Sequence, residues 1–342
     1  MPRTRPPSMA DVAAEAGVSH QTVSRVLNGH AYVRDDTRER VLAAIRALGY
    51  RPNQAARTLA TSRSATVGIV TTGTTHYGPA STVLAIEEAA RAGGYFVSIA
   101  ALDSREPGAA AAVLDQLITQ GVDGIVVVAP LVDVARLVDE VSPRIPVVVV
   151  AARRDAPEDS PVRYVAVDQR AGSVRATTHL ADLGHERIAH IEGPTGWFDA
   201  IERSRGFSDA IDRAGVQGTI VPAQGWSARH GYEVGVRLAE DVGRGRITAV
   251  FAGNDYLALG ATRALWERGI RVPEDVSIAG FDDIDGSGFL VPSLTTVRQP
   301  FARLGAAAVR GLIEAWDGAE ASDGATIEPE VVVRESTVPP RG

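Results

Sequence analysis

The sequence predicts an N-terminal all-α helix-turn-helix headpiece followed by an α/β body of two lobes with parallel sheets. Three observations support this fold class. Residues 8–48 show three short helical patterns. From residue 65 onward, Val- and Ile-rich runs alternate with amphipathic helices, as in parallel sheets buried on both faces. The 342 residues are 45% apolar but only 5% aromatic, so the core is aliphatic and the length suits two or three domains.

The head is expected to hold three helices that share one small core. They are a first helix over about Met9–Glu15 capped by Ser8, a second over about His20–Leu27 capped by Ser19, and a third that opens at Asp35, Asp36 or Thr37 and ends near Leu48. Gly17 supplies the tight turn between the first two helices, and Ala13 is small enough for the second helix to approach. The expected core residues are Val12, Ala16, Val18, Val23 and Val26.

This spacing leaves polar side chains facing outward on and just after the second helix. They are Gln21, Thr22, Ser24, Arg25 and Asn28. Glutamine pairs well with adenine and arginine with guanine in the major groove. Residues 1–62 carry nine arginines against five acids, a net charge of +4, whereas the rest of the chain carries −11. A basic head on an acidic body predicts a localised contact with double-stranded DNA; the alternative is an ordinary helical hairpin with a polar face.

The body is expected to contain nine strands separated by helices. The strands are 67–72, 95–101, 124–130, 147–151, 165–168, 187–193, 219–223, 249–253 and 276–282. Motifs for phosphate binding, nucleophilic catalysis and zinc are absent from the sequence, and it has no cysteine. We therefore expect no enzyme activity, no cofactor and no metal site. Because the sequence has no signal-peptide pattern and no apolar run of membrane-spanning length, we also expect a cytoplasmic protein without membrane contact.

Polar and aromatic residues follow several of these strands, where ligands of open α/β sheets collect. They are Thr71 and Thr72 with His76, Tyr77 and Pro79 in a loop beyond the first strand, Arg203 at the "RSRGF" turn of the helix after the strand 187–193, Trp226, Asn254 with Asp255, and Asp282 with Asp283. Each has an ordinary explanation alone: a helix cap, a surface ion pair or a core indole. Together they suit a sugar, whose hydroxyls bind acids, amides and guanidinium groups and whose ring face packs on tryptophan.

The stretch "ADVAAEAGVSHQTVSRVLNGHAYVRDDTRERVLAAIRALGYRPNQAARTLAT" resembles the DNA-binding headpiece of the lactose-repressor/galactose-repressor (LacI/GalR) family of transcriptional regulators. The blocks "GPTGWFDAIERSRGF", "FAGNDYLALGA" and "GFDDIDGSGFLVPSLTTVRQPF" extend the resemblance along the body. It implies a headpiece over 6–50, a hinge helix and linker over 51–64, and an effector-binding and dimerisation domain over 65–338. That domain has the periplasmic-binding-protein-like fold, in which the chain crosses three times between lobes.

The resemblance also assigns DNA contacts. It implies that His20, Gln21 and Arg25 read operator bases, and that Thr22, Ser24 and Asn28 contact the backbone or pack nearby. His20 stands where the best-known member has a tyrosine, so the operator sequence does not carry over. The hinge "RPNQAARTLA" would fold where two copies meet in the minor groove, with Leu59 wedged between base pairs and Asn53 and Ala56 in close contact. The alternative is a plain linker whose Leu59 rests on the body.

For the effector, the resemblance implies a cleft shared by both lobes. Its residues are Thr72, Tyr77 and Pro79 on one side and Arg203, Trp226, Asn254, Asp282 and Gln299 on the other, with Phe301 alongside. One position departs from the pattern: Ala151 stands where the resemblance places a sugar-binding aspartate, so the effector need not be a lactose analogue.

These observations together predict a homodimeric repressor that leaves a palindromic DNA operator when a mono- or disaccharide binds. The expectation of a dimer rather than a tetramer rests on the C-terminal "VVVRESTVPPRG", which has no leucine heptads. Two alternatives stay open. One is a corepressor-dependent regulator that binds a non-sugar metabolite. The other is from a different class: a free sugar-binding protein or a Rossmann-like enzyme. The lack of a signal-peptide pattern counts against the sugar-binding protein, and the lack of a phosphate loop counts against the enzyme.

Overall fold

The computed structural model describes residues 7–27, 32–50, 63–71, 76–102, 109–128, 131, 134, 138, 145–152, 162–318 and 325–341. Within-chain contacts divide the chain into two compact units, Met1–Ser64 and Ala65–Gly342. The predicted residues Asn28, Asn53, Ala56, Leu59 and Thr72 lie outside the described residues.

The head consists of helices α1 (Met9–Ala16), α2 (His20–Leu27) and α3 (Asp35–Leu48), as the sequence predicts. Ser8 and Asp11 form a capping box, in which each side chain accepts a hydrogen bond from the other residue's backbone N–H. Gly17 ends α1 with φ of 61°, a left-handed conformation that glycine adopts at little cost. The Ser19 hydroxyl accepts a hydrogen bond from the Thr22 backbone at 3.2 Å.

The third helix opens at Asp35, one of the three starts that the sequence predicts. Arg34 precedes it, and the Arg34 side chain makes no capping hydrogen bond. Asp35 and Asp36 occupy the first turn, where their negative charge interacts favourably with the helix dipole. The predicted core is confirmed: its buried residues are Val12, Ala13, Ala16, Val23, Val26, Val41, Ala44 and Tyr50, with Val18 partly buried against them.

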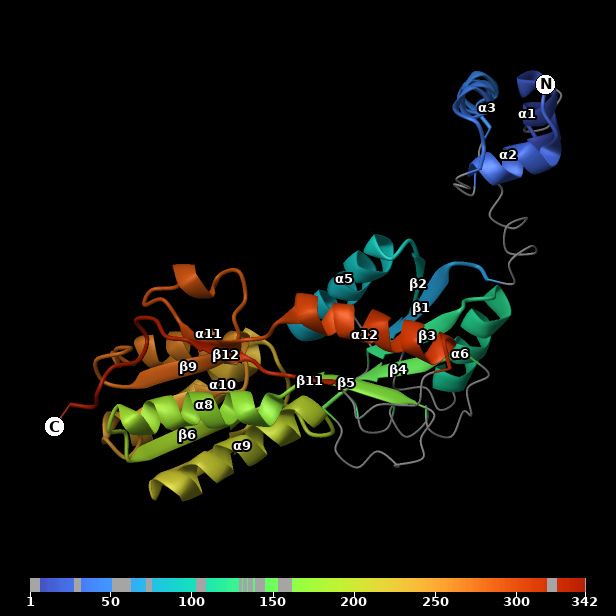
Figure 1. Ribbon diagram of the computed structural model, residues 1–342. Coiled ribbons are helices and arrows are strands. Elements are labelled where there is room, and N and C mark those ends of the chain that lie inside the picture. The colour runs from blue at the N-terminus through green and yellow to red at the C-terminus, as the bar shows by residue number, and fades with distance from the viewer. Residues whose placement is uncertain are drawn as a thin grey trace, which may run out of the picture. The chain divides into compact units, whose positions relative to one another are not determined.

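The described strands of the body form two six-stranded sheets, each at the centre of one lobe (Figure 1). The sheet of lobe 1 has the order β11 (Ala325–Ile327), β5 (Arg163–Val167), β4 (Val147–Val150), β3 (Gly124–Val128), β1 (Thr66–Thr71) and β2 (Phe96–Ala101). The sheet of lobe 2 has the order β12 (Glu330–Val332), β10 (Thr295–Arg298), β9 (Ser277–Asp282), β8 (Ala249–Ala252), β6 (Arg187–Glu192) and β7 (Gln217–Pro222).

All nine predicted strands are present and pair in parallel. Each observed end lies within two residues of the predicted end, wherever the structure describes those residues. The sequence did not predict β10, β11 or β12. These strands are only three or four residues long and lack a continuous apolar run, so they do not show the pattern of a buried strand. Among the described pairs, β12 with β10 is antiparallel.

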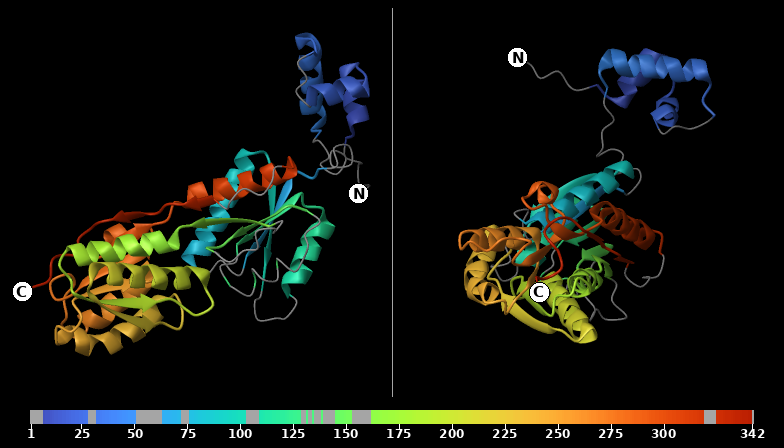
Figure 2. Two further views of the ribbon diagram at one scale, coloured as in Figure 1. Left: turned by 60° about the horizontal axis from the view of Figure 1, so that its bottom comes forward. Right: turned by 90° about the vertical axis from the view of Figure 1, so that its left-hand side faces the viewer.

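Helices cover both faces of each sheet (Figure 2). In lobe 1, α5 (Tyr77–Ala92) and α12 (Phe301–Trp316) pack together, while α6 (Ala109–Gln120) contributes to a separate core. In lobe 2, α8 (Gln169–Asp182) and α9 (Phe198–Ala214) form one layer, and α10 (Ala228–Gly243) and α11 (Asp255–Trp266) form the other. A short 3-10 turn, η1 (Ser287–Phe289), follows β9. None of the helices in the described ranges is both long and apolar enough to span a membrane.

Among the described elements, the chain passes between lobes at three places. It leaves lobe 1 between β5 and α8, returns between β10 and α12, and leaves again between β11 and β12. This is the predicted connectivity. The first two crossings contain Gln169 and Gln299, which places both residues at the junction of the lobes.

Glycines bring α10 and α11 into close contact, and this contact positions two predicted cleft residues. A Cβ atom on Gly260 would lie 1.8 Å from the Ala228 carbonyl oxygen, and one on Gly231 would lie 2.2 Å from that of Leu257. The helices begin just after Trp226 and Asn254, and the Asn254 amide donates to the Trp226 carbonyl at 3.2 Å. The helix spacing therefore sets the position of both side chains.

Substitution of Gly260 by alanine is expected to destabilise the body by about 1–3 kcal/mol, because backbone on both helices must move to admit the methyl group. Gly243→Ala is the matched control, since a Cβ there meets nothing within 4 Å. Urea unfolding followed by tryptophan fluorescence measures both variants. Equal stability of the two would show that the helices can separate without cost.

Candidate functional site

A cleft between the ends of the two sheets collects seven of the eight residues predicted to bind an effector. Its free volume is about 30 Å³. Its lining residues are His76, Tyr77, Gly78, Pro79, Trp197, Asp199, Arg203, Trp226, Asn254, Asp282 and Gln299. The side chains come from both lobes, so a ligand here would contact both.

The local placement of Tyr77 and Pro79 differs from the expectation. Tyr77 and Pro79 form the first turn of α5 rather than a loop, and proline is tolerated there because the first N–H groups of a helix have no partner within it. Arg203 lies within α9, the helix on which the sequence predicts it, and only 3% of it is exposed. It is therefore buried and not a surface ion pair.

Four side chains form a closed ring of polar contacts in the cleft, which we call the cleft ring. Arg203 Nε donates to Gln169 Oε1 at 2.9 Å, and Gln169 Nε2 donates to Gln299 Oε1 at 2.9 Å. Gln299 Nε2 donates to Asp282 Oδ1 at 2.7 Å, and Asp282 Oδ1 lies 3.5 Å from Arg203 Nη2. All four residues are buried. The ring ties the carboxylate and guanidinium to the two crossings that contain the glutamines.

Arg203 has further partners that fix its position. Its Nη1 donates to the Gly253 carbonyl, and its guanidinium lies 3.7 Å from the ring centre of Phe281 and 5.4 Å from that of Trp226. A buried guanidinium requires this number of hydrogen bonds and charge contacts to offset its lost hydration. The group is thus held in place before any ligand arrives.

Asp282 ends β9 in an unusual state. Burial raises its pKa to about 7, although the positive charge of Arg203 opposes the rise and the negative charge of Asp255 adds to it. Its backbone φ is 112° and that of Asp283 is 55°, both in the region that favours glycine. Asp283 is held by Arg298 and Arg334, each at 2.6 Å. Such strain persists only where surrounding contacts enforce it, and it concentrates at functional sites.

Asn254 and Asp255 have the structural roles that the sequence left open. Asn254 caps α11, accepting a hydrogen bond from the Leu257 backbone at 2.8 Å, and it also lines the cleft. Asp255 is fully buried and accepts hydrogen bonds from Ser287, Thr296 and the Ile284 backbone. Burial raises its pKa to about 6, and these bonds limit the rise. Asp255 therefore joins η1 and β10 to α11 rather than facing a ligand.

Sequence reasoning missed three residues of this region: Gln169, Trp197 and Asp199. Trp197 packs edge-on against Trp226, with ring centres 5.7 Å apart, and against His76 at 5.4 Å. Burial raises the pKa of Asp199, which lies in the first turn of α9. The sequence could have indicated Trp197 and Asp199, because both follow β6 at its carboxyl end. Nothing local distinguishes Gln169, whose partner Gln299 is 130 residues away.

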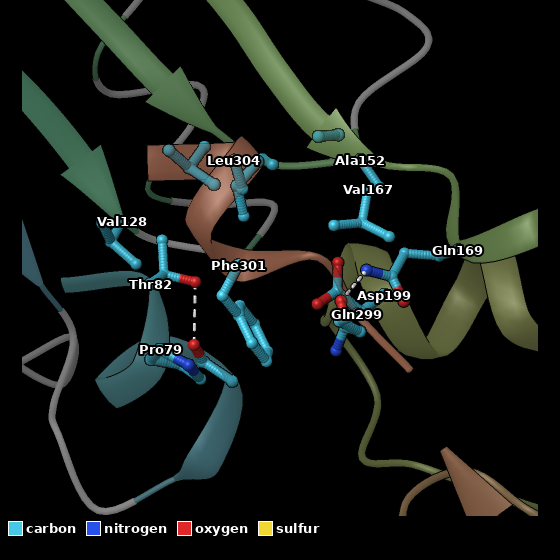
Figure 3. Close-up of a pocket in the computed structure, with 14 residues that line it drawn as sticks. Pro79, Thr82, Val128, Ala152, Val167, Gln169, Asp199, Gln299, Phe301 and Leu304 are labelled. Atoms are coloured by element: carbon cyan, nitrogen blue, oxygen red, sulfur yellow. Dashed lines mark hydrogen bonds between the residues drawn. The ribbon is translucent and has the colours of Figure 1, made fainter. Parts of the chain in front are cut away.

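Beyond Asp199 and Gln299 the cleft continues into a second space of about 40 Å³, the apolar end (Figure 3). It is lined by Gly78, Pro79, Thr82, Val128, Val150, Ala151, Ala152, Ala166, Val167, Gln169, Asp199, Gln299, Phe301 and Leu304. Figure 3 shows Gln169, Asp199 and Gln299 together on one side, opposite Val128 and Thr82. Ala151, the departure noted in the sequence, lies in this wall.

The head presents a polar surface on α2. His20, Gln21 and Arg25 are exposed, and the last two lie on one helix face because they are four residues apart. Val23 and Val26 are buried on the opposite face. Thr22 and Ser24 are only half exposed, and the Thr22 hydroxyl is 2.9 Å from that of Ser19. Thr22 thus makes a contact within the head.

Comparison with known proteins identifies the family. Residues 8–53 match the description "Bacterial regulatory proteins, lacI family", and residues 177–337 match "Periplasmic binding protein-like domain". The lactose operon repressor of Escherichia coli K12 is 32% identical over 98% of this chain and 92% of its own length. The chain belongs to the lacI family. Members of this family are DNA-binding transcriptional regulators rather than enzymes, as predicted.

Other relatives and solved structures have similar identity to this chain. The transcriptional repressor PurR of Haemophilus influenzae PittEE is 36% identical over 96% of this chain and 98% of its own length. Among solved structures, a lac repressor dimer bound to operator and the anti-inducer ONPF has a TM-score of 0.85 at 31% identity, covering 98% of this chain and all of that one. The regulator CelR in complex with cellobiose has a TM-score of 0.69 at 31% identity, covering 96% and 99%.

The raised pKa of Asp282 predicts a pH dependence of stability. The unfolded carboxyl loses its proton near pH 4, whereas the folded one keeps it until about pH 7, so the free energy of unfolding falls as pH rises between these values. Asp282→Asn is expected to reduce this fall between pH 5 and pH 7.5, measured by urea unfolding.

The control for this prediction is Asp275→Asn. The Arg271 side chain holds the pKa of Asp275 well below its usual range, so its contribution changes only at lower pH. The account of Asp282 is contradicted if both variants show the same change of stability with pH as the parent chain.

Proposed function

We propose that the protein is a dimeric transcriptional repressor whose head binds a palindromic operator and whose cleft binds a small carbohydrate that releases the DNA. One observation carries the proposal: the acid, amide, guanidinium and indole groups of Asp282, Gln299, Arg203 and Trp226 converge in one cleft of a chain with a helix-turn-helix head. We further propose that it acts in the cytoplasm, where operator DNA is accessible.

The head supplies the DNA contact. Gln21 and Arg25 are exposed on one face of α2, and each can form two hydrogen bonds with a base edge in the major groove. His20 lies at the start of the same helix, the end that reaches base edges in helix-turn-helix proteins. The hinge residues Asn53, Ala56 and Leu59 remain predicted minor-groove contacts.

The cleft suits a polyhydroxyl ring. Trp226 lines the cleft, and its buried Nε1–H has no hydrogen-bond acceptor among the described residues. A buried donor without a partner costs about 1–3 kcal/mol, so a ligand oxygen that accepts this bond would stabilise the complex. Asp199 and Asn254 add acceptors on the same wall.

The cleft ring connects the ligand site to the crossings between the lobes, so ligand binding can change the orientation of the lobes. A hydroxyl that binds Arg203 or Asp282 competes with the contacts of Gln169 and Gln299, which sit at two crossings. Rotation of the lobes would then change the spacing of the two hinge segments in a dimer. Coupling of this kind is typically about 1–3 kcal/mol, or roughly 5–150-fold in operator affinity.

A dimer interface is favoured by the apolar edge of lobe 1. β2 is an edge strand of the described sheet, and its Phe96 and Ile99 are 63% and 54% exposed, with Leu84 of α5 at 59%. An exposed apolar edge strand is an aggregation hazard unless a partner covers it. A second copy of the chain would cover this edge and place two heads on a two-fold operator.

The corepressor alternative also has an observation in its favour. The chain is as similar to repressors named PurR as to the lactose operon repressor, so overall identity does not separate a sugar from a purine. An inducing sugar would weaken DNA binding, whereas a corepressor would strengthen it.

The test is a selection of duplexes bound by the full chain, followed by fluorescence anisotropy of the selected operator with sugars and nucleobases. The proposal expects a palindromic site, a steep loss of affinity with salt, and release by a sugar. Tighter binding with a nucleobase would establish the corepressor alternative. No enrichment of any sequence would contradict both.

Arg25→Ala is expected to weaken binding to the selected operator by about 1–3 kcal/mol, because it removes a base contact. Binding to random duplex should change far less. Arg46→Ala, in the last turn of α3, is the control for loss of one positive charge from the head. Equal losses on operator and random DNA would make Arg25 a phosphate contact.

Phe96→Glu is expected to raise the dimer dissociation constant at least about tenfold, because it places a charge within the apolar edge. Light scattering at micromolar concentration measures the mass. Trp266→Glu is the control, since Trp266 is 64% exposed but lies on α11 of lobe 2. A dimeric mass for Phe96→Glu with unchanged affinity would place the interface elsewhere.

A further inference from the structure

The described wall of the cleft offers two acids but only one cation. The acids are Asp199 and Asp282, and the cation is Arg203. His76 also lines this space, but burial lowers the pKa of its imidazole, so it adds no charge at pH 7. A ligand in the cleft therefore meets more acidic than basic groups.

The guanidinium of Arg203 is already engaged. Its Nε donates to Gln169, its Nη1 donates to the Gly253 carbonyl, and its Nη2 lies 3.5 Å from Asp282 Oδ1. One face of the group lies over Phe281. These contacts direct the N–H groups of Arg203 away from Asp199, on which Arg203 acts only as a charge at a distance.

Asp199 is left without a bonded partner. It lies in the first turn of α9 and lines both ends of the cleft, beside Gln169 and Gln299 in Figure 3. Its carboxyl group forms no hydrogen bond or ion pair with any residue in the ranges that the structure describes. Burial raises its pKa, because the charged form loses hydration there. A bound cation would restore the lost stabilisation of the carboxylate.

A second group on the same wall lacks a partner and has the opposite hydrogen-bonding character. Trp226 is only 6% exposed, and within the described part of the chain its Nε1–H finds no acceptor. A small cation alone would satisfy Asp199 but could not accept the indole hydrogen bond. A ligand that satisfies both groups must carry a positive charge and a neutral oxygen.

These groups keep their spacing when the cleft opens. The free volume of about 30 Å³ is smaller than a sugar ring, so the lobes must separate to admit one. Asp199, Arg203, Trp226 and Asp282 all lie in lobe 2, on α9, before α10 and at the end of β9. Movement of lobe 1 therefore leaves the unpartnered acid and the indole N–H in place.

We propose that the effector is an amino sugar, whose ammonium group binds Asp199 while one of its oxygens accepts the Trp226 Nε1–H. This rests on the proposed function of the cleft and narrows its ligand class. A charge-assisted hydrogen bond between an ammonium and a carboxylate is roughly twice as strong as one between neutral groups. A phosphorylated or carboxylated sugar is disfavoured, because its negative charge would meet Asp199 while Arg203 is already bonded.

The experiment is calorimetric titration of the full chain near pH 6.5, where the amine of such sugars carries its proton. Each set of probes holds a parent sugar, its 2-amino form and the N-acetylated amine, which keeps the nitrogen but loses the charge. Glucose, galactose and mannose sets are titrated, with adenine and guanine alongside. In the set that binds, the amino form is expected to bind at least about tenfold more tightly than the other two.

A pair of variants locates the effect. Asp199→Asn keeps the shape of the side chain and removes its charge, so the advantage of the amino form should fall to about twofold or less. Asp212→Asn is the matched control, because Asp212 is exposed on the same helix and does not line the cleft. Thermal unfolding of both variants identifies any general loss of structure.

The outcomes separate this inference from the proposed function. Binding of neutral sugars without an advantage for the amino form would overturn the amino sugar and leave the sugar effector standing. An advantage that persists in Asp199→Asn, or that Asp212→Asn reduces equally, would do the same. Binding of a nucleobase with no binding of any sugar would overturn both. No binding by any probe of the three sets would also overturn the inference.

Discussion

A single buried guanidinium organises the centre of the body. Arg203 pairs with Asp282, bonds to Gln169 and the Gly253 carbonyl, and lies over Phe281. Removing one member of a buried ion pair costs about 3–5 kcal/mol, because the other charge stays buried and unpaired. The positions of β9, of α8 and of the crossing through Gln299 all depend on this group. A ligand that replaces any of its contacts must therefore act on the junction of the lobes.

The strained end of β9 follows from the same arrangement. Asp282 and Asp283 adopt positive φ, which costs of order 1–3 kcal/mol for each residue. Arg298 and Arg334 bind the Asp283 carboxylate, and Gln299 binds that of Asp282, so the cost is offset by charge-assisted bonds. The bend points adjacent side chains in different directions: Asp282 faces the cleft while Asp283 ties β9 to β10 and the C-terminal segment.

Local patterns predicted much of this fold. Ser8 and Ser19 indicate helix starts, Gly17 indicates a turn, and nine Val- and Ile-rich runs indicate strands. These predictions succeed because each signal lies within a few residues of the structure that it determines. The family resemblance led to Arg203, Trp226, Asn254, Asp282 and Gln299, which the structure brings together. Gln169 was not predicted because its role exists only through Arg203 and Gln299, distant in sequence. The apolar end was not predicted because Val128 and Ala151 look like ordinary strand residues until the cleft forms around them.

We propose that the cleft ring couples ligand binding to DNA binding. Its most direct test is the ratio of operator dissociation constants with and without the effector, measured for the parent chain and for Gln169→Leu, with effector affinity titrated separately on each. The variant is expected to bind the effector still but to lose most of the roughly 5–150-fold change in operator affinity. An unchanged ratio in a variant that folds and binds effector normally would contradict it.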